Sequence, residues 1–170
     1  TERWGKPGFR ELLLEMARLW REERGRVERA AEGVAERLAG TGVADPGADV
    51  PGTSALDAAT REFLASYDWR NGGFGGAPKF PRPSELLFLL AEHRRTGDRK
   101  LLDVVAHTLT AMAAGGVRDQ IGGGFHRYSV DARWRVPHFE KMLYDQAQLV
   151  LAYLEAARAT GDQGFVDVAE

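Results

Sequence analysis

Apolar residues recur every three or four positions over residues 1–40, a spacing that is typical of a helix. Pro7 is suited to the first turn of such a helix, and Gly40 is suited to its end. The pattern predicts one long helix, or two helices in line, with a charged and solvated middle over residues 21–29. The apolar positions that carry it are Phe9, Leu13, Met16, Trp20, Val27, Ala31, Val34 and Leu38.

Residues 41–53 contain Gly, Pro and Asp at a density that no regular element tolerates, which predicts a linker. After the linker, Ser54 is followed three residues later by Asp57, a pattern that resembles a capping box. Apolar residues at helical spacing then predict a helix that runs to about Asp68.

A glycine-rich loop and two helices follow the predicted helix. The loop fills the stretch between Asp68 and Pro83, and a helix that is apolar on nearly every side starts at Ser84. A Thr-Gly-Asp turn at 96–98 ends that helix and caps an amphipathic one, which stops at Gly115. The second helix has one buried stripe, made of Leu101, Val105, Leu109 and Met112.

The same order of elements then returns. A second glycine-rich loop covers residues 117–137, and the alternation within it predicts a short hairpin or an extended segment. A helix is predicted from about His138, followed by a Thr-Gly-Asp turn at 160–162 and the start of another helix. We expect this helix to bury a stripe that comprises Leu143, Ala147, Val150, Leu154 and Ala157.

Three short matches relate the two parts: Gly-Gly-Phe at 72–74 and 123–125, Pro-Lys-Phe at 78–80 with Pro-His-Phe at 137–139, and the two Thr-Gly-Asp turns. Stacked helical hairpins that alternate all-buried and half-buried helices indicate an all-α toroid with inner and outer rings. The loops before the inner helices of such a ring emerge at one end. We therefore expect both glycine-rich loops at one mouth, where ligands bind.

Composition narrows the class of protein. The 170 residues are 44% hydrophobic and 28% charged with a net charge of −2, which is typical of a soluble globular protein. We expect no nucleic-acid partner, no membrane association and a cytoplasmic location. The absence of cysteine excludes thiol chemistry within these residues. Because the sequence starts at Thr1, we expect it to be part of a longer chain.

Polar side chains gather between Asp119 and Asp145 more than anywhere else in the chain. His126 and His138 are candidates for a general acid and base, and the alternative is that they hold the loop by hydrogen bonds. Glu140 is expected to share a helix face with Tyr144 and Gln148. The remaining polar candidates for contact with a substrate or for orienting it are Arg127, Lys141, Tyr144 and Asp145.

Aromatic residues flank both glycine-rich loops, and their ring faces suit the apolar side of a sugar. The equally weighted alternative is that they plug the mouth of the toroid. Glu140 with Asp131 or Asp145 would provide the carboxylate pair of a glycosidase. No familiar metal-ligand spacing is present, and we expect neither a metal nor a cofactor. The aromatic candidates for substrate contact are Trp69, Phe74, Tyr128 and Trp134.

The runs at 122–129 and 134–146, with shorter ones at 3–9 and 71–81, carry a family resemblance. On them the chain resembles the thioredoxin-domain-containing family of spermatogenesis-associated protein 20 type. Members join a thioredoxin-like domain to an (α/α)₆ barrel similar to the N-acylglucosamine 2-epimerase and six-hairpin glycosidase folds. In the epimerases, inner-helix histidines act as acid and base on a sugar.

The resemblance implies an internal fragment of such a protein. Residues 1–40 would be the C-terminal helix of a truncated thioredoxin-like domain, 41–53 a linker, and 54–170 the first hairpins of a partial (α/α)₆ toroid. The leading hypothesis is a carbohydrate-active epimerase or isomerase. The alternative is a non-catalytic binding or redox-accessory protein whose toroid is a platform for a ligand or partner. We also expect exposed inner helices to pair two copies of the chain.

Overall fold

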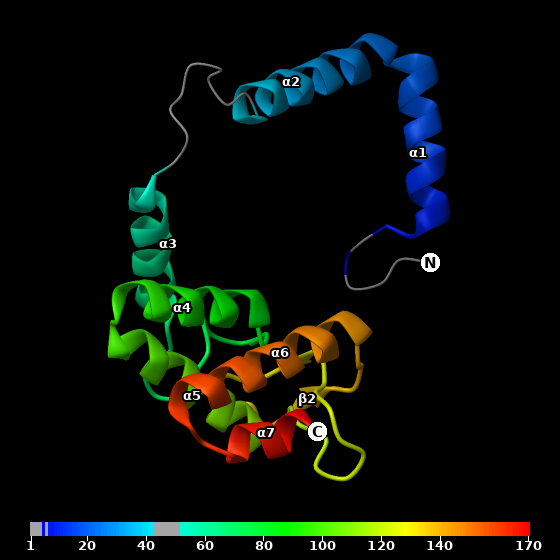
Figure 1. Cartoon of the computed structure of the whole chain (residues 1–170). Helices are drawn as coiled ribbons and strands as arrows, with labels where there is room; N and C mark the ends of the chain where they lie inside the picture. Colours follow the sequence, from blue (N-terminus) through cyan, green and yellow to red (C-terminus); the bar gives the residue numbers. More distant parts are fainter. Residues whose placement is uncertain (1–4, 6, 43–51) are drawn as a thin grey trace. The chain divides into compact units, whose positions relative to one another are not determined.

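The computed structural model describes residues 5, 7–42 and 52–170, and it divides into two compact units on either side of about residue 50 (Figure 1). The predicted linker lies outside the described residues over 43–51. No finding tests the assignment of residues 1–40 to a thioredoxin-like domain, which stays a prediction. Each unit is described by itself below.

The first unit is a pair of helices, α1 (Phe9–Glu22) and α2 (Arg24–Gly42). The predicted helices are confirmed between Phe9 and Gly42, but Pro7 precedes the first turn and Gly40 does not end α2. The two helices are not in line, because the chain bends at Glu23 and α2 leaves in a new direction (Figure 1). No side chain of α1 is buried. Phe9, Met16 and Trp20, which the periodicity marked as a packed stripe, are exposed to solvent.

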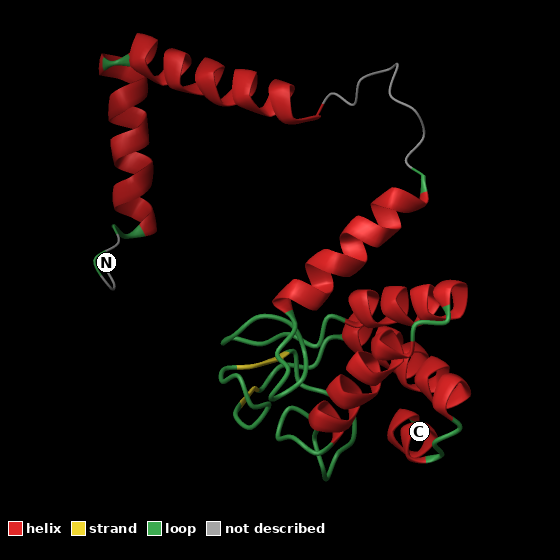
Figure 2. Ribbon diagram, turned by 90° about the vertical axis from the view of Figure 1, so that its left-hand side faces the viewer, coloured by secondary structure: helices red, strands yellow, loops and turns green. Residues whose placement is uncertain are grey.

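The second unit is a helical domain with a very small sheet (Figure 2). The predicted all-α class is confirmed, and the two successive helical hairpins, α4 with α5 and α6 with α7, are the repeated unit of a toroid. No described helix is long and apolar enough to cross a membrane. The elements are α3 (Thr53–Ser66), α4 (Pro83–Thr96), α5 (Arg99–Ala113), β1 (Tyr128–Ser129), β2 (Pro137–His138), α6 (Leu143–Thr160) and α7 (Gly164–Ala169).

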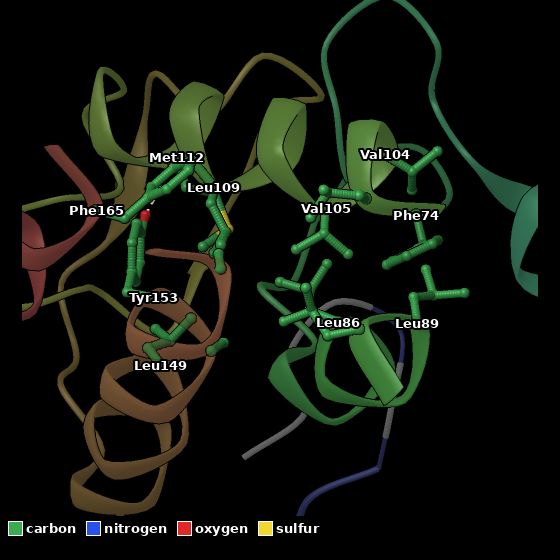
Figure 3. Close-up of a cluster of buried hydrophobic side chains, with 14 of the residues drawn as sticks. Phe74, Leu86, Leu89, Val104, Val105, Leu109, Met112, Leu149, Tyr153 and Phe165 are labelled. Carbon is green, nitrogen blue, oxygen red and sulfur yellow. Dashed lines mark hydrogen bonds between the residues drawn. The ribbon is translucent and has the colours of Figure 1, made fainter. Parts of the chain in front are cut away.

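The core lies between α4, α5 and α6 (Figure 3). Leu86 and Leu89 of α4 meet the fully buried stripe of α5, which is the stripe that the sequence predicted. From α6, Tyr153 enters the core and its hydroxyl donates a hydrogen bond of 2.8 Å to the carbonyl of Leu109. The buried tyrosine thus keeps its polar atom satisfied while its ring packs against apolar neighbours.

Helices α4 and α6 each end at a glycine. Gly97 and Gly161 end α4 and α6 in the left-handed conformation, with φ of 75° and 76°, so both Thr-Gly-Asp turns are confirmed. Asp98 caps α5 by accepting a hydrogen bond from the backbone N–H of Lys100. The predicted capping box at Ser54 is wrong, because α3 starts one residue earlier and Gly52 is its N-cap.

Helix α6 differs from its prediction in start and in phase. It begins at Leu143 rather than at about His138, because the preceding residues pair with β1 as strand β2. The predicted buried stripe is wrong: Leu143 is 85% exposed, Ala147 and Val150 are also exposed, and Leu154 and Ala157 are only partly buried. The helix is apolar on two sides, and the side with the large Tyr153 is the buried one, with the Tyr153 ring against Phe125 and Phe165. The buried residues of α6 are Leu149, Ala152, Tyr153 and Ala156.

Candidate functional site

The two glycine-rich loops meet at one end of the helical domain, as the repeat predicted. Lys79 of the first loop and Ser129 of the second exchange two backbone hydrogen bonds of 2.8 Å. Ser129 also pairs with Pro137 across the antiparallel β1–β2 hairpin, which confirms the extended segment expected in this loop. The hairpin therefore lies beside the first loop, and side chains from both loops come together.

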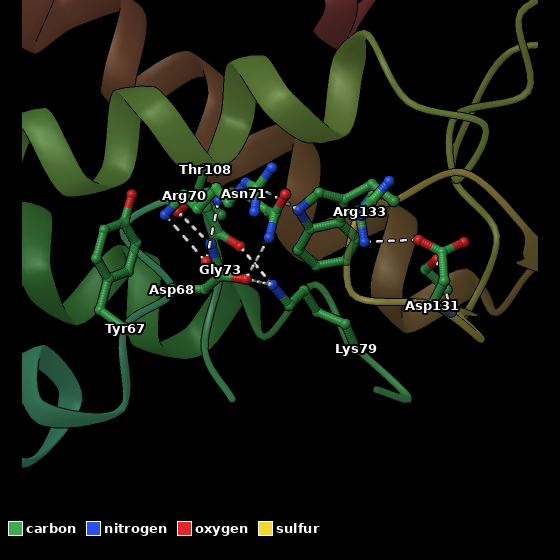
Figure 4. A network of polar contacts seen from close by, with 12 residues as sticks. Tyr67, Asp68, Arg70, Asn71, Gly73, Lys79, Thr108, Asp131 and Arg133 are labelled. Carbon is green, nitrogen blue, oxygen red and sulfur yellow. Dashed lines mark hydrogen bonds and ion pairs between the residues drawn. The ribbon is translucent and has the colours of Figure 1, made fainter. Parts of the chain in front are cut away.

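A buried polar network, which we call the Lys79 network, joins the loops (Figure 4). The Lys79 side chain is fully buried, and its Nζ donates hydrogen bonds of 2.6 Å to Asp68 Oδ2 and 2.9 Å to the carbonyl of Gly72. Burial raises the pKa of Asp68, but the hydrogen bonds from Lys79 and Asn71 outweigh it and hold that pKa well below its usual range. This lysine, which the sequence analysis did not single out, is structural.

Trp134 closes this network from the second loop. Its ring is fully buried, its Nε1 donates a hydrogen bond of 3.0 Å to the carbonyl of Asn71, and Lys79 Nζ lies 5.5 Å from the ring centroid. Gly73 leaves room for the ring, because a Cβ there would lie 2.5 Å from Trp134 Cζ2. The proposed stacking of Trp134 on a substrate is wrong. This residue plugs the mouth, as the alternative interpretation held.

A cavity of about 480 Å³, which we call the Asp145 cavity, lies where the first loop and α4 meet the start of α6. Three of the candidate residues from the sequence also line this cavity: Arg127 from the second loop, and Tyr144 and Asp145 from α6. Phe74 also lines it but is otherwise buried in the core, against Phe63 and Tyr67. The other lining residues are Pro78, Phe80, Pro81, Arg82, Pro83, Ser84 and Glu85.

The charges around the Asp145 cavity are only partly paired. Arg82 forms an ion pair of 2.8 Å with Glu85, and Arg127 forms one of 3.0 Å with Glu140. Within the part of the chain that the structure describes, the Asp145 carboxylate has neither a hydrogen bond nor an ion pair. Burial raises its pKa, against the lowering effect of the positive charge on Arg127. The cavity therefore contains a carboxylate that is free to bond a ligand.

Three rings form a row beside this cavity. Tyr128 stacks on His138 with ring centroids 4.7 Å apart, and Phe80 lies 4.8 Å from Tyr128 on the neighbouring segment. Tyr128 stands on the middle of three paired segments, so its two sides face the other two rings and not a substrate. His138 is half exposed, and its Nε2 lies 3.9 Å from Glu140 Oε2. His138 and Glu140 therefore lie side by side, and Glu140 joins them to the lining residue Arg127, but neither of the two lines the Asp145 cavity.

Glu140 precedes α6 and does not share a helix face with Tyr144, which corrects the expectation from the sequence. Its backbone carbonyl accepts a hydrogen bond from Arg127, and this pairing keeps residues 138–142 out of the helix. Asp131 is not available for a glycosidase carboxylate pair, because its carboxylate accepts hydrogen bonds of 2.6 and 2.7 Å from the backbone N–H groups of Arg133 and Val136.

The other predicted site residues lie outside the lining of the Asp145 cavity. His126 packs edge-on against Phe139, and its Nδ1 is buried without a hydrogen bond in the described structure. Trp69 is exposed, with Lys100 Nζ 5.0 Å from its ring centroid. Lys141 binds Asp119 and the carbonyl of Gly123 and lines a different cavity, so its assignment to this substrate site is corrected.

Phe80, Arg82 and Glu85 line the cavity but were missed from the sequence. Their only signal was their position in the loop and first turn that precede an inner helix, the same position that drew attention to the second loop. No group of three or more His, Asp or Glu side chains that could hold a metal ion is found among the described residues.

Comparison with known proteins gives relatives and a fold. No family model matches the chain. It is 42% identical to spermatogenesis-associated protein 20 of Homo sapiens and 41% identical to that of Rattus norvegicus, in each case over 96% of this chain and 22% of the relative. The chain therefore spans about a fifth of the length of these relatives.

Among solved structures, a sugar epimerase from a ruminal bacterium superposes with a TM-score of 0.59 at 21% identity, over 68% of this chain and 34% of that one. At this identity the likeness concerns the fold alone. The chain is thus similar, over nearly all of its residues, to one segment of spermatogenesis-associated protein 20, and its helical domain has a fold like that of a sugar epimerase.

Proposed function

We propose that the Asp145 cavity binds a sugar and that side chains in and next to it carry out proton transfer of the epimerase or isomerase type. The observation that carries the proposal is the meeting of Arg127, Tyr144 and Asp145 in one cavity, with the half-exposed His138 next to Glu140, the ion-pair partner of Arg127. The likeness of the fold to that of a sugar epimerase supports the same class of ligand. Any activity of a longer protein that contains this chain is likewise a proposal.

The lining suits a sugar in two respects. Phe80 and Tyr144 are about half exposed, and their rings offer flat apolar surface to the C–H face of a pyranose. Arg127 donates hydrogen bonds and Asp145 accepts them, so the hydroxyl groups of a sugar find partners of both kinds. A concave site with apolar walls and few polar groups is the usual form of a small-molecule site.

Acid–base chemistry requires groups that exchange protons near neutral pH. Imidazole is the side chain best suited to this, and His138 lies beside Glu140, which pairs with the lining residue Arg127. Asp145 is the second candidate, since burial raises the pKa of its carboxyl, against the lowering effect of Arg127. In this assignment Glu140 and Arg127 orient the imidazole and the sugar, and His126 remains a candidate outside the lining.

Binding is tested first, by ligand-observed NMR of the full chain with a panel of mono- and disaccharides. We expect a sugar from the panel to bind, and we expect Arg127→Ala and His138→Ala to weaken its binding by about tenfold or more. Lys100→Ala, on the exposed start of α5, is the matched control and leaves binding unchanged. Failure of every sugar to bind would overturn the proposal.

Catalysis is tested on the sugar that binds. Incubation in deuterated water should exchange one carbon-bound proton of that sugar, visible as loss of its NMR signal. His138→Ala should slow the exchange by about a hundredfold, the typical contribution of one general acid or base. Binding without exchange would contradict the catalytic part of the proposal.

A non-catalytic platform is the second candidate, and one observation favours it. The exposed side of α6 carries Leu143 and Leu151, which are 85% and 54% exposed and could contact a partner. This reading predicts a bound ligand or partner with no exchange of carbon-bound protons, so the deuterium experiment separates the two functions.

A further inference from the structure

The two glycine-rich loops contain the same hydrogen-bonded turn. In the first, the N–H of Asp68 donates to Gly73 O at 2.8 Å, and its carboxylate accepts the N–H of Asn71 at 3.0 Å. In the second, the N–H of Asp119 donates to Gly124 O at 2.9 Å, and its carboxylate accepts the N–H of Gly122 at 2.8 Å. The two turns therefore correspond residue by residue.

A lysine closes each turn in the same way. In the first turn, Lys79 Nζ donates hydrogen bonds to Asp68 and to the carbonyl of Gly72. In the second turn, Lys141 Nζ donates hydrogen bonds of 2.7 Å to Asp119 and to the carbonyl of Gly123. We call these arrangements the first clamp and the second clamp. Their likeness corrects the sequence alignment of the repeat, in which His138 took the place of Lys79.

The two clamps differ in what covers them. Trp134 lies over the first clamp, and the Lys79 side chain is 0% exposed. The Lys141 side chain of the second clamp is 36% exposed. Trp134 comes from the loop that follows the first clamp in the chain, so the cover of one clamp is supplied by the next repeat.

The second clamp retains the groups that hold the indole in the first. Asn71 O accepts the hydrogen bond of Trp134 Nε1, and its counterpart Gly122 O accepts no hydrogen bond from the described residues. A cavity of about 440 Å³ lies beside Gly122 and Lys141, with Leu149 and Val168 among its walls. It thus offers an acceptor, a cation and apolar surface, which together suit an indole ring.

We propose that the second clamp is a docking site for a tryptophan-bearing extended segment, whose indole N–H bonds the carbonyl of Gly122 and whose ring covers Lys141. The occupant is a later segment of a longer polypeptide, because the chain spans only 22% of the human relative and the cover of the first clamp, Trp134, comes from the following repeat. This site is distinct from the Asp145 cavity and does not depend on a sugar ligand.

The test uses the natural cover of the first clamp as its probe. A synthetic peptide with the sequence of residues 131–137, Asp-Ala-Arg-Trp-Arg-Val-Pro, is titrated into the full chain and followed by amide NMR. We expect saturable shifts at Gly122, Gly123 and Gly124. The same peptide with Trp replaced by Ala should bind at least about tenfold more weakly, as expected for an indole anchor.

Two variants locate the site. Lys141→Met should weaken binding of the Trp peptide, whereas Lys100→Met, at an exposed lysine of α5, should not. Equal binding of the Trp and Ala peptides would overturn the proposal. So would shifts at Gly72 and Gly73, which would mean that the peptide displaces Trp134 from the first clamp. A dimer of the chain that the peptide dissociates would assign the site to a second copy and overturn the intramolecular source.

Discussion

The first and second clamps have the same internal contacts but opposite surroundings. Asp68 and Lys79 are joined at 2.6 Å under Trp134, and Asp119 and Lys141 are joined at 2.7 Å with the lysine open to solvent. Local sequence, an aspartate four residues before Gly-Gly in each loop, is enough to form the turn. Burial is decided by the repeat that follows: Trp134 from the second loop covers the first turn, and no described residue covers the second turn in this way.

The two clamps should differ most in their loss of stability when the lysine charge is removed. Lys79→Met keeps the length of the side chain but leaves Asp68 partly buried without its partner, which costs about 3 kcal/mol or more. Lys141→Met acts on an exposed pair, and its cost is less than about 1 kcal/mol. Urea unfolding monitored by far-UV circular dichroism measures both. Equal losses would show that the cover of Trp134 adds nothing.

Replacing a turn glycine with alanine should give a smaller difference in stability between the two clamps. Gly73 and Gly124 both have positive φ, of 78° and 72°, so alanine is strained at either position. At Gly73 the new Cβ also meets the buried Trp134 ring, whereas at Gly124 it meets the end of the Gln146 side chain, which can move. We expect Gly73→Ala to cost about 2–4 kcal/mol and Gly124→Ala about 1–2 kcal/mol.

The same unfolding measurement checks this pair. A larger loss at Gly124 than at Gly73 would contradict the tight packing of the first clamp. Gly75→Ala is the matched control, because Gly75 has a φ of 73° and no atom within 4 Å of the added Cβ. Its loss isolates the backbone strain.

The smallest difference between the two clamps is expected in how their stability responds to acid and salt. Hydrogen bonds hold the pKa of Asp68, despite its burial, and that of Asp119 below the value of about 3.9 in an unfolded chain. The stabilisation from each carboxylate is therefore complete above about pH 4 and is lost as the pH falls further. Salt screens exposed pairs more than buried ones, so the contribution of Asp119 should shrink with added salt and that of Asp68 should persist.

Melting temperatures of Asp68→Asn and Asp119→Asn, compared with the parent chain between about pH 2 and pH 6 at low and high salt, check this expectation. The salt effect is expected to be small, because the Asp119–Lys141 pair is exposed. Equal salt dependence of the two variants would contradict the difference in burial.

Much of the fold could be predicted from the sequence, because each part of it is encoded locally. The α5 stripe and the two Thr-Gly-Asp turns depend on spacing and on the left-handed preference of glycine at Gly97 and Gly161. The start of α6 could not be predicted this way. The backbone of His138 pairs with Tyr128, a contact between segments that overrides the helical pattern of the sequence around it.

The site could be predicted only in part, for the same reason. Arg127, Tyr144 and Asp145 lie in the segment that the density of polar residues indicated, and they do line one cavity. Which aromatic ring faces solvent depends on tertiary packing, so the sequence could not separate buried Trp134 from exposed Trp69. Lys79 was missed, and Lys141 was assigned to a substrate and not to a clamp, because the spacing from aspartate to lysine differs between the two loops.

The proposed sugar site lies in the Asp145 cavity, beside the first clamp, which we expect to stay fixed when a sugar binds. The decisive measurement is amide NMR of the labelled chain, titrated with the sugar that binds best in the panel. We expect saturable shifts at Phe80, Arg127, Tyr144 and Asp145, with Lys79 and Trp134 unmoved. Shifts confined to other residues, or none with any sugar, would contradict it.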